Sequence, residues 1–204
     1  AEDGARKTVD GPVRFAVIGN TRGSLRALDS RGAVSGVTQE LLSDLTVAAA
    51  QPEGPDFLVM MGDHVRSGST LEWRRLGKRL EGLVSSGEEG SAGIPALPVV
   101  GDRESFSDER LARWGAAFPG AGVDIGYNRV ASWYSFDIVT DGHSWRFVVL
   151  DTGKKRLGSR WSEQINWLSE EAADRFDSLV VLMHDPLYDL SGNPMNADDA
   201  PREL

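Results

Sequence analysis

The chain has 204 residues, of which 40% are hydrophobic, and this length and composition predict a single domain with one sizeable core. Its 22 basic residues are outnumbered by 31 acidic ones, and the formal net charge of -9 argues against general binding to nucleic acid or to anionic lipid. The absence of cysteine excludes disulfides, thiolate metal sites and cysteine nucleophiles. No apolar run approaches the roughly 20 residues that a membrane-spanning helix needs, so no membrane span is predicted.

Both ends of the chain are polar. The chain starts at Ala1 and continues with polar residues, so we expect a flexible N-terminal segment over 1–12. Such a start fits a mature exported protein, periplasmic or secreted, and it also fits a trimmed cytoplasmic protein. The domain is expected over 13–190, followed by a polar loop or truncated tail over 191–204.

The first half of the expected domain alternates short apolar runs with helical patterns. The first run covers 13–20, and residues 37–51 then show the apolar spacing of a helix. A second run covers 57–63. Ser69 and Glu72 follow with the spacing of a capping box, which predicts the start of another helix.

The second half adds a strand hairpin to this alternation. Asp141 and Gly142 give the turn signal, in a loop that we expect to be slightly longer than the tightest hairpin type. The expected elements are, in chain order, a run at 97–102, a helix at 107–118, hairpin strands at 133–139 and 145–150, a helix at 161–172 and a run at 179–183. This order predicts an α/β sandwich whose second sheet is partly antiparallel.

The four apolar runs end in polar residues. The first three each end in a glycine followed by Asn20, Asp63 or Asp102, and the fourth is followed by His184. Short runs rich in valine are typical of buried strands in a parallel sheet. Because ligands bind beyond the carboxyl ends of such strands, we expect these side chains to converge. Together they predict an oxygen-and-imidazole cluster able to hold a divalent cation.

The ordered set of strand ends resembles the calcineurin-like metallophosphoesterases over most of the chain. The matching segments are Gly19-Asn20-Thr21-Arg22, Gly62-Asp63-His64, Gly101-Asp102-Arg103-Glu104 and Met183-His184-Asp185. The resemblance implies an αββα sandwich of mixed parallel and antiparallel sheets, with the C-terminal part of the family domain missing from this chain. It also implies metal-dependent hydrolysis of phosphate esters.

The resemblance assigns metal-ligand positions, and some of them carry other residues here. Asp63 corresponds to the family's bridging carboxylate, Asp102 replaces a ligand Asn, and His184 matches a lone metal-binding His. Asn20 stands where the family has a ligand Asp, and Arg22 where it has a ligand His. An amide is a poorer ligand than a carboxylate, and a guanidinium cannot ligate because it stays protonated.

The acid that the family uses to protonate the leaving group is also replaced. Arg103 stands in place of that histidine, and arginine clamps a phosphate but is a poor acid near neutral pH. The family's closing Gly-His-x-His is absent from this chain. We therefore expect either one divalent ion (Mn, Fe, Zn or Mg) or none, with Arg22 and Arg103 placed to stabilise the phosphoryl charge.

Each candidate also has a structural interpretation. Asp63 alternatively caps its loop, His184 is alternatively a satisfied polar group at a strand end, and Asp102 alternatively pairs with Arg103 or Arg22.

The sequence leads to two hypotheses about function. The first is a divergent phosphoesterase of weak or impaired activity, acting on a phosphorylated small molecule or binding another anion. The second is a non-catalytic module of the same fold that binds or scaffolds a protein partner.

Overall fold

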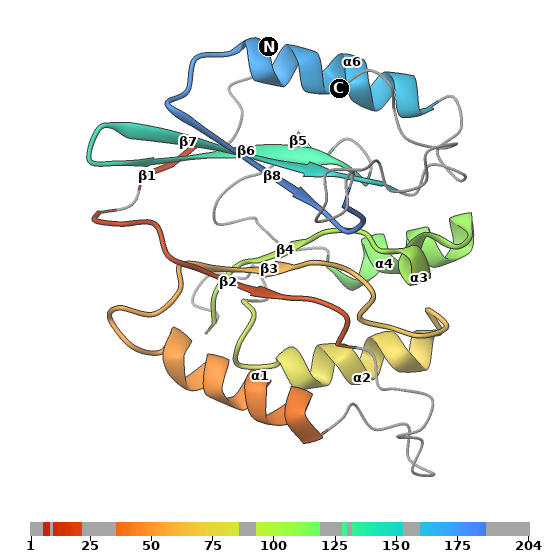
Figure 1. Cartoon of the computed structure of the whole chain (residues 1–204). Helices are drawn as coiled ribbons and strands as arrows, with labels where there is room; N and C mark the ends of the chain where they lie inside the picture. Colours follow the sequence, from red (N-terminus) through yellow and green to blue (C-terminus); the bar gives the residue numbers. More distant parts are fainter. Residues whose placement is uncertain are drawn as a thin grey trace.

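The computed structural model describes residues 6–8, 10–21, 36–85, 93–118, 128–129, 132–152 and 160–186. Two β-sheets pack face to face. Helices α1 (Gly36–Ala49) and α2 (Thr70–Leu80) cover the outside of one sheet, and α6 (Arg160–Ala173) covers the outside of the other (Figure 1). This order of layers confirms the αββα sandwich that the sequence predicted.

The first sheet is parallel and has the strand order β2-β3-β4. Its strands are β2 (Phe15–Ile18), β3 (Phe57–Met60) and β4 (Ala96–Pro98). They coincide with the first three apolar runs, and the segments that contain α1 and α2 make the crossover connections that parallel strands need. Every residue of β3 is 0% exposed, because this strand has a neighbour along each edge and is covered on both faces.

The second sheet is mixed and has five strands. Its centre is a hairpin of β6 (Tyr134–Thr140) and β7 (His143–Leu150). The strands are joined by Asp141 and Gly142 alone, whose φ values are 48° and 78°. Positive φ at both central residues is the mark of the tightest hairpin turn, so the expectation of a longer loop is wrong.

Three further strands complete the mixed sheet. β8 (Ser178–Met183) runs parallel to β7, β1 (Arg6–Thr8) runs parallel to β6, and β5 (Asn128–Arg129) is antiparallel to β6. β8 is the fourth apolar run, and it joins this sheet rather than the sheet of the first three runs, because the crossover through α6 returns the chain beside β7. β1 lies within the segment 1–12, while residues 191–204 lie outside the described part of the chain.

Two apolar cores lie on the two sides of the parallel sheet. The first fills the space between that sheet and the helices α1, α2 and α4 (Asp108–Ala117), and it contains the buried rings of Trp73 and Trp114. The second lies between the two sheets. There Phe57 packs edge-on against Phe136 and Phe147, with ring centroids 5.9 and 5.5 Å apart, an arrangement that aromatic pairs favour.

The helices begin where the sequence places their capping residues. Ser69 and Glu72 form the predicted capping box at the start of α2. Ser107 precedes α4, and its side-chain oxygen accepts a hydrogen bond from the backbone N–H of Arg110 at 3.3 Å. The short helix α3 (Asp102–Ser105) follows β4 after three residues and was not expected. In the described part of the chain, every helix is too short or too polar to cross a membrane.

Helix α6 is held to the mixed sheet by Arg146 of β7. Its guanidinium meets both carboxylate oxygens of Asp137 on β6, at 2.8 Å each. Its Nη1 donates to the backbone carbonyl of Glu171 at 2.7 Å, in the last turn of α6. The same nitrogen donates to the carboxylate of Asp174 at 2.9 Å, directly after the helix. These hydrogen bonds raise the pKa of Arg146 despite its partial burial, and those to Asp137 have the largest effect.

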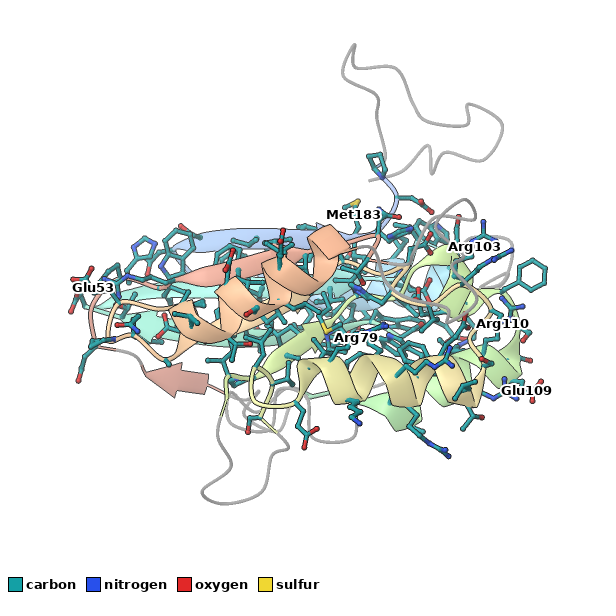
Figure 2. The ribbon with its side chains drawn as sticks, turned by 90° about the horizontal axis from the view of Figure 1, so that it is seen from below. Glu53, Arg79, Arg103, Glu109, Arg110 and Met183 are labelled. Carbon is teal, nitrogen blue, oxygen red and sulfur yellow. The ribbon has the colours of Figure 1, made fainter. Side chains whose placement is uncertain are left out.

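Two strand edges on one side of the sandwich carry exposed apolar side chains. β2 and β8 are the end strands of their sheets in the described chain, and they lie on the same side of the molecule (Figure 2). Phe15 and Val17 of β2 are 39% and 53% exposed, and Leu179 of β8 is 41% exposed. The expectation of buried strands is therefore wrong for alternate residues of these two strands, because no described strand pairs with their outer edges.

Candidate functional site

Strand ends from both sheets meet at one end of the sandwich (Figure 1). His184, directly after β8, donates a hydrogen bond from Nδ1 to the carbonyl oxygen of Met61, directly after β3, over 2.6 Å. This approach depends on Gly62, where a Cβ atom would lie 2.7 Å from the Cα of Gly101 and 2.9 Å from Nδ1 of His184. Glycine therefore allows the ends of β3, β4 and β8 to lie in contact.

The second nitrogen of the His184 ring faces acidic side chains. Because Nδ1 carries the proton donated to Met61, Nε2 of the neutral ring has a free lone pair. Nε2 lies 3.7 Å from Oδ1 of Asp63 and 4.0 Å from Oδ1 of Asp185. A histidine fixed by a carbonyl at one nitrogen, with carboxylates at the other, has the arrangement of a metal ligand.

One further carboxylate, that of Asp102, lies near this ring. Asp102, His184 and Asp185 each offer a ligand atom within 4.8 Å of the other two. Burial, and secondly the charge of Asp102, raise the pKa of Asp185. A bound cation would offset both effects. Among the described residues no ion pair joins Asp102 to Arg103, while Arg22, the other expected partner of Asp102, lies outside them.

The carboxylate of Asp63 is held in place by the chain that follows β4. Asp63 is 3% exposed and has a left-handed backbone, with φ of 57°. Its Oδ1 accepts a hydrogen bond from the backbone N–H of Arg103 at 3.0 Å. This bond fixes the start of α3 against the loop after β3, and the same oxygen is the one that faces His184.

Glu104 organises the loop that carries Asp63. Its carboxylate is 0% exposed and accepts hydrogen bonds from four backbone N–H groups. The donors and their distances are Asp63 at 2.8 Å, His64 at 2.8 Å, Val65 at 3.2 Å and Gly101 at 3.1 Å. Burial raises the pKa of Glu104, although the hydrogen bonds to its carboxylate oppose that rise. The strand ends of β3 and β4 are thus tied to one side chain.

His64 connects the loop after β3 to the loop after β2. Its Nε2 accepts a hydrogen bond from the N–H of Gly62 at 3.1 Å, so Nδ1 carries the proton and donates to Oγ1 of Thr21 at 2.8 Å. The residue is 5% exposed, and burial lowers its pKa to about 4. His64 is therefore a neutral structural histidine near neutral pH.

The loop after β8 rests on the end of β7. The backbone N–H of Asp185 donates to Oγ1 of Thr152 at 3.1 Å. One step further from the cluster, the fully buried side chain of Gln164 in α6 bonds both backbone groups of Asp151, accepting from the N–H at 2.8 Å and donating to the carbonyl at 3.1 Å. Helix α6 thereby fixes the strand end that positions Asp185.

Of the remaining predicted residues, Asn20 and Arg103 are exposed in the described part of the chain. Asn20 is exposed, and its left-handed backbone, with φ of 51°, donates from N–H to the carbonyl of Gly62 at 3.0 Å. Arg103 is exposed at the same end of the molecule as Arg110 (Figure 2). Arg22 lies outside the described residues. Asp63 and Asp102 thus each lie near His184, while the metal role of all these residues stays a prediction.

Comparison with known proteins identifies the family. The profile of the family described as calcineurin-like phosphoesterase matches residues 15–203. The chain belongs to this family. No curated protein matches the chain significantly. A solved structure of a protein of unknown function from Aquifex aeolicus is similar over 80% of this chain and 76% of that chain. The identity is 12% and the TM-score 0.36, and a likeness at that score supports no conclusion about this phosphoesterase.

The phosphoesterase family implies bound metal, and Asp102, His184 and Asp185 are the donors of this chain that fit one ion, because a ligand atom of each lies within 4.8 Å of the other two. Asp63 lies near His184 but is not a member of this set. Two ligands that each lie about 2.0–2.2 Å from a metal are at most about 4.4 Å apart. The separations of 3.7 and 4.0 Å from Nε2 of His184 to Asp63 and Asp185 fall within this limit. Carboxylate and imidazole donors of this kind suit Mn, Fe, Zn or Mg.

Sequence reasoning missed two residues of the candidate site. Asp185 was not among the expected ligands, although an acid directly after His184 at a strand end is a visible signal. Glu104 was given no role. Its position three residues after Gly101 is the spacing of a capping box, and its carboxylate indeed accepts the N–H of Gly101. That spacing was the available clue to its function in the loop.

Proposed function

We propose that the chain is a divergent phosphoesterase that binds one divalent ion and hydrolyses a phosphate ester weakly. Asp63, Asp102 and His184 are the proposed ligands, and Asp185 joins them. The observation that carries the proposal is the ring of His184, whose Nδ1 is fixed to the carbonyl of Met61 while Nε2 faces two carboxylates.

In the proposed site the ion and the side chains have different roles. A divalent ion there supplies positive charge that polarises a phosphoryl oxygen and acidifies bound water. The exposed guanidinium of Arg103 attracts and orients the phosphate group of a phosphorylated small molecule through charge-assisted hydrogen bonds. Arginine does not release a proton near neutral pH, so the leaving group receives no help from this position, and turnover is slow.

A second candidate is a non-catalytic module that binds an anion or a protein partner. The exposed amide of Asn20 favours it, since this position offers a weak ligand and no carboxylate. The hydrogen bond from Arg103 N–H to Asp63 Oδ1 favours it too, because that oxygen then has one lone-pair direction fewer for a metal. Under this proposal the candidate site holds phosphate through Arg103 and catalyses no reaction.

Calorimetric titration of the full chain with manganese(II) near neutral pH tests the metal site. We expect one site, and in Asp185→Asn and in His184→Gln an affinity at least about tenfold lower. Asp141→Asn makes the same chemical change in the hairpin turn, at the opposite end of β7, and is expected to bind like the parent. Two tight independent sites, or full affinity in both variants, would contradict the proposal.

Turnover of 4-nitrophenyl phosphate separates the enzyme from the module. The enzyme shows slow, manganese-dependent hydrolysis that is lost in Asp63→Asn, an exchange that the left-handed backbone tolerates. The module shows no turnover and loses phosphate binding in Arg103→Ala, while Arg14→Ala, at the other end of the parallel sheet, keeps it. Fast hydrolysis that vanishes in Asp63→Asn would overturn the impaired activity that we propose.

A further inference from the structure

A groove runs between α2 and α4 on the outer side of the parallel sheet, away from the candidate site. Its volume is about 770 Å³, within the range of pockets that hold small molecules. Its apolar wall is formed by the side chains of Trp73, Leu76, Leu80, Val84, Ala117 and Phe118. None of the residues that line this α2–α4 groove belongs to the candidate site.

Gly77 keeps the middle of the groove open. It lies inside α2 and lines the groove, and a Cβ atom built on it would meet no atom of the described chain within 4 Å. A glycine inside a helix costs about 0.5–1 kcal/mol relative to alanine. No contact among the described residues requires a glycine at this position, and the missing side chain leaves the groove open to solvent there.

Trp73 leaves a buried donor without an acceptor in the same wall. Its ring packs edge-on against Phe118, with the centroids 5.9 Å apart, and both rings line the groove. Its Nε1–H is buried and has no hydrogen-bond partner in the described part of the chain. An unpaired buried donor costs about 1–3 kcal/mol. Because this nitrogen is closed off from solvent, a ligand in the groove would contact the ring of Trp73 rather than its N–H.

The rim of the groove carries two cations with no acidic partner. Arg74 and Lys78 lie one helical turn apart on α2, line the groove, and form no ion pair within the described residues. Arg113 also lines the groove, but its guanidinium already bonds Glu109 and the carbonyl of Gly68. Glu81 lies at the far end. In a chain of net charge -9, two like charges held together at this spacing favour an anionic partner.

We propose that the α2–α4 groove binds a carboxylate amphiphile, that is, a linear apolar chain with one carboxylate, as in a fatty acid. The apolar chain lies along Trp73, Leu76 and Leu80 and is removed from water there. The carboxylate forms charge-assisted hydrogen bonds with Arg74 and Lys78. This binding site is separate from phosphate-ester hydrolysis and does not depend on a metal ion.

Titration of the full chain with dodecanoate below its micelle concentration, followed by calorimetry and tryptophan fluorescence, tests this proposal. We expect one saturable site per chain. Dodecyltrimethylammonium, which has the same chain and the opposite charge, is expected to bind at least about tenfold more weakly. Equal affinity for both amphiphiles, or uptake of many molecules per chain, would overturn the proposal, since either result indicates unspecific apolar binding.

Two sets of variants locate the site. Gly77→Leu fills the groove and should abolish dodecanoate binding while keeping or raising the unfolding temperature, because leucine favours helix more than glycine does. The pair Arg74→Gln and Lys78→Gln should lower the affinity at least about tenfold, whereas Arg75→Gln, on the same helix and outside the groove, should not. If Gly77→Leu unfolds, the charge variants decide alone, and parent-like affinity in them refutes the site.

Discussion

Strands β2 and β3 are neighbours with the same local sequence pattern, and they have very different surroundings. They pair in register, from Phe15 opposite Phe57 to Ile18 opposite Met60, and each is followed closely by a glycine and a polar residue. All of β3 is 0% exposed, whereas Val17 of β2 is 53% exposed. The difference follows from position, since β3 pairs along both edges and β2, among the described strands, along one.

The residues that follow these strands differ in the same way. Asp63 after β3 is 3% exposed, and its loop is bonded to Glu104 by successive backbone N–H groups. Asn20 after β2 is exposed. A short motif at a strand end therefore specifies a residue type, and the packing around the strand determines how firmly that residue is held. Asp63, the candidate residue that follows the inner strand, is therefore held more firmly than Asn20.

The largest contrast is expected between the glycines that follow the two strands. In Gly62→Ala the new Cβ would lie 2.7 Å from the backbone of Gly101, at a φ of +83°, so we expect a loss of at least about 3 kcal/mol of unfolding free energy. In Gly19→Ala the Cβ would meet only the Cβ of Met61, at 3.1 Å, and we expect a loss below about 1 kcal/mol. Urea unfolding measures both, and similar losses would break the comparison.

Lowering the pH should weaken the contact that His64 makes between the loop after β3 and the loop after β2. Burial lowers the pKa of His64 from 6.5 to about 4. Between these pH values the unfolded chain binds a proton that the folded chain does not. The unfolding free energy should therefore be highest above about pH 6.5 and fall as the pH approaches 4, by up to about 3 kcal/mol. Urea unfolding at several pH values across this range measures the slope.

Two histidine variants show whether this slope belongs to the buried ring. His64→Gln should remove most of the pH dependence in this range. His143→Gln makes the same change at an exposed residue of the hairpin and should keep it. A slope that persists unchanged in His64→Gln would mean that another group controls the acid sensitivity of these loops.

The smallest contrast is expected inside the strands, at two valines that face each other across the pair. Val59→Ala opens space in the core between the sheets, where Val59 is 0% exposed, and should cost about 2 kcal/mol. Val17→Ala, at its partner position and 53% exposed, should cost about 0.5 kcal/mol or less. Thermal unfolding of the two variants side by side checks the ratio, and equal costs would show that β2 is as well covered as β3.

Much of the fold could be predicted because local rules fix it. The apolar runs coincide with strands, and Ser69 with Glu72 forms the capping box that starts α2. Local rules did not reveal that β8 joins the mixed sheet, since both sheets contain parallel pairs and a run of Leu and Val suits either. Nor did they reveal which side chains of β2 and β8 would be exposed, because strand order is a property of the whole chain.

The candidate site was predictable in its residue types and less so in its geometry. The position of Asp63, Asp102 and His184 at strand ends follows from the sequence, because parallel strands bring their carboxyl ends together. The inclusion of Asp185 depends on the loop that Thr152 holds after β7, a contact between residues far apart in the chain. The bonds of Glu104 to the loop after β3 likewise span about forty residues, beyond the reach of any local pattern.

The two-residue turn at Asp141 and Gly142 has a consequence for how the molecule folds. Strands joined so closely find each other within about 1–10 μs, whereas β2 and β3 must close a loop of roughly forty residues before they pair. We expect the β6–β7 hairpin to form first and to provide the template on which β8 assembles. Because His184 meets Met61 only when both sheets are in place, we expect the candidate site to be completed only after the two sheets have packed together.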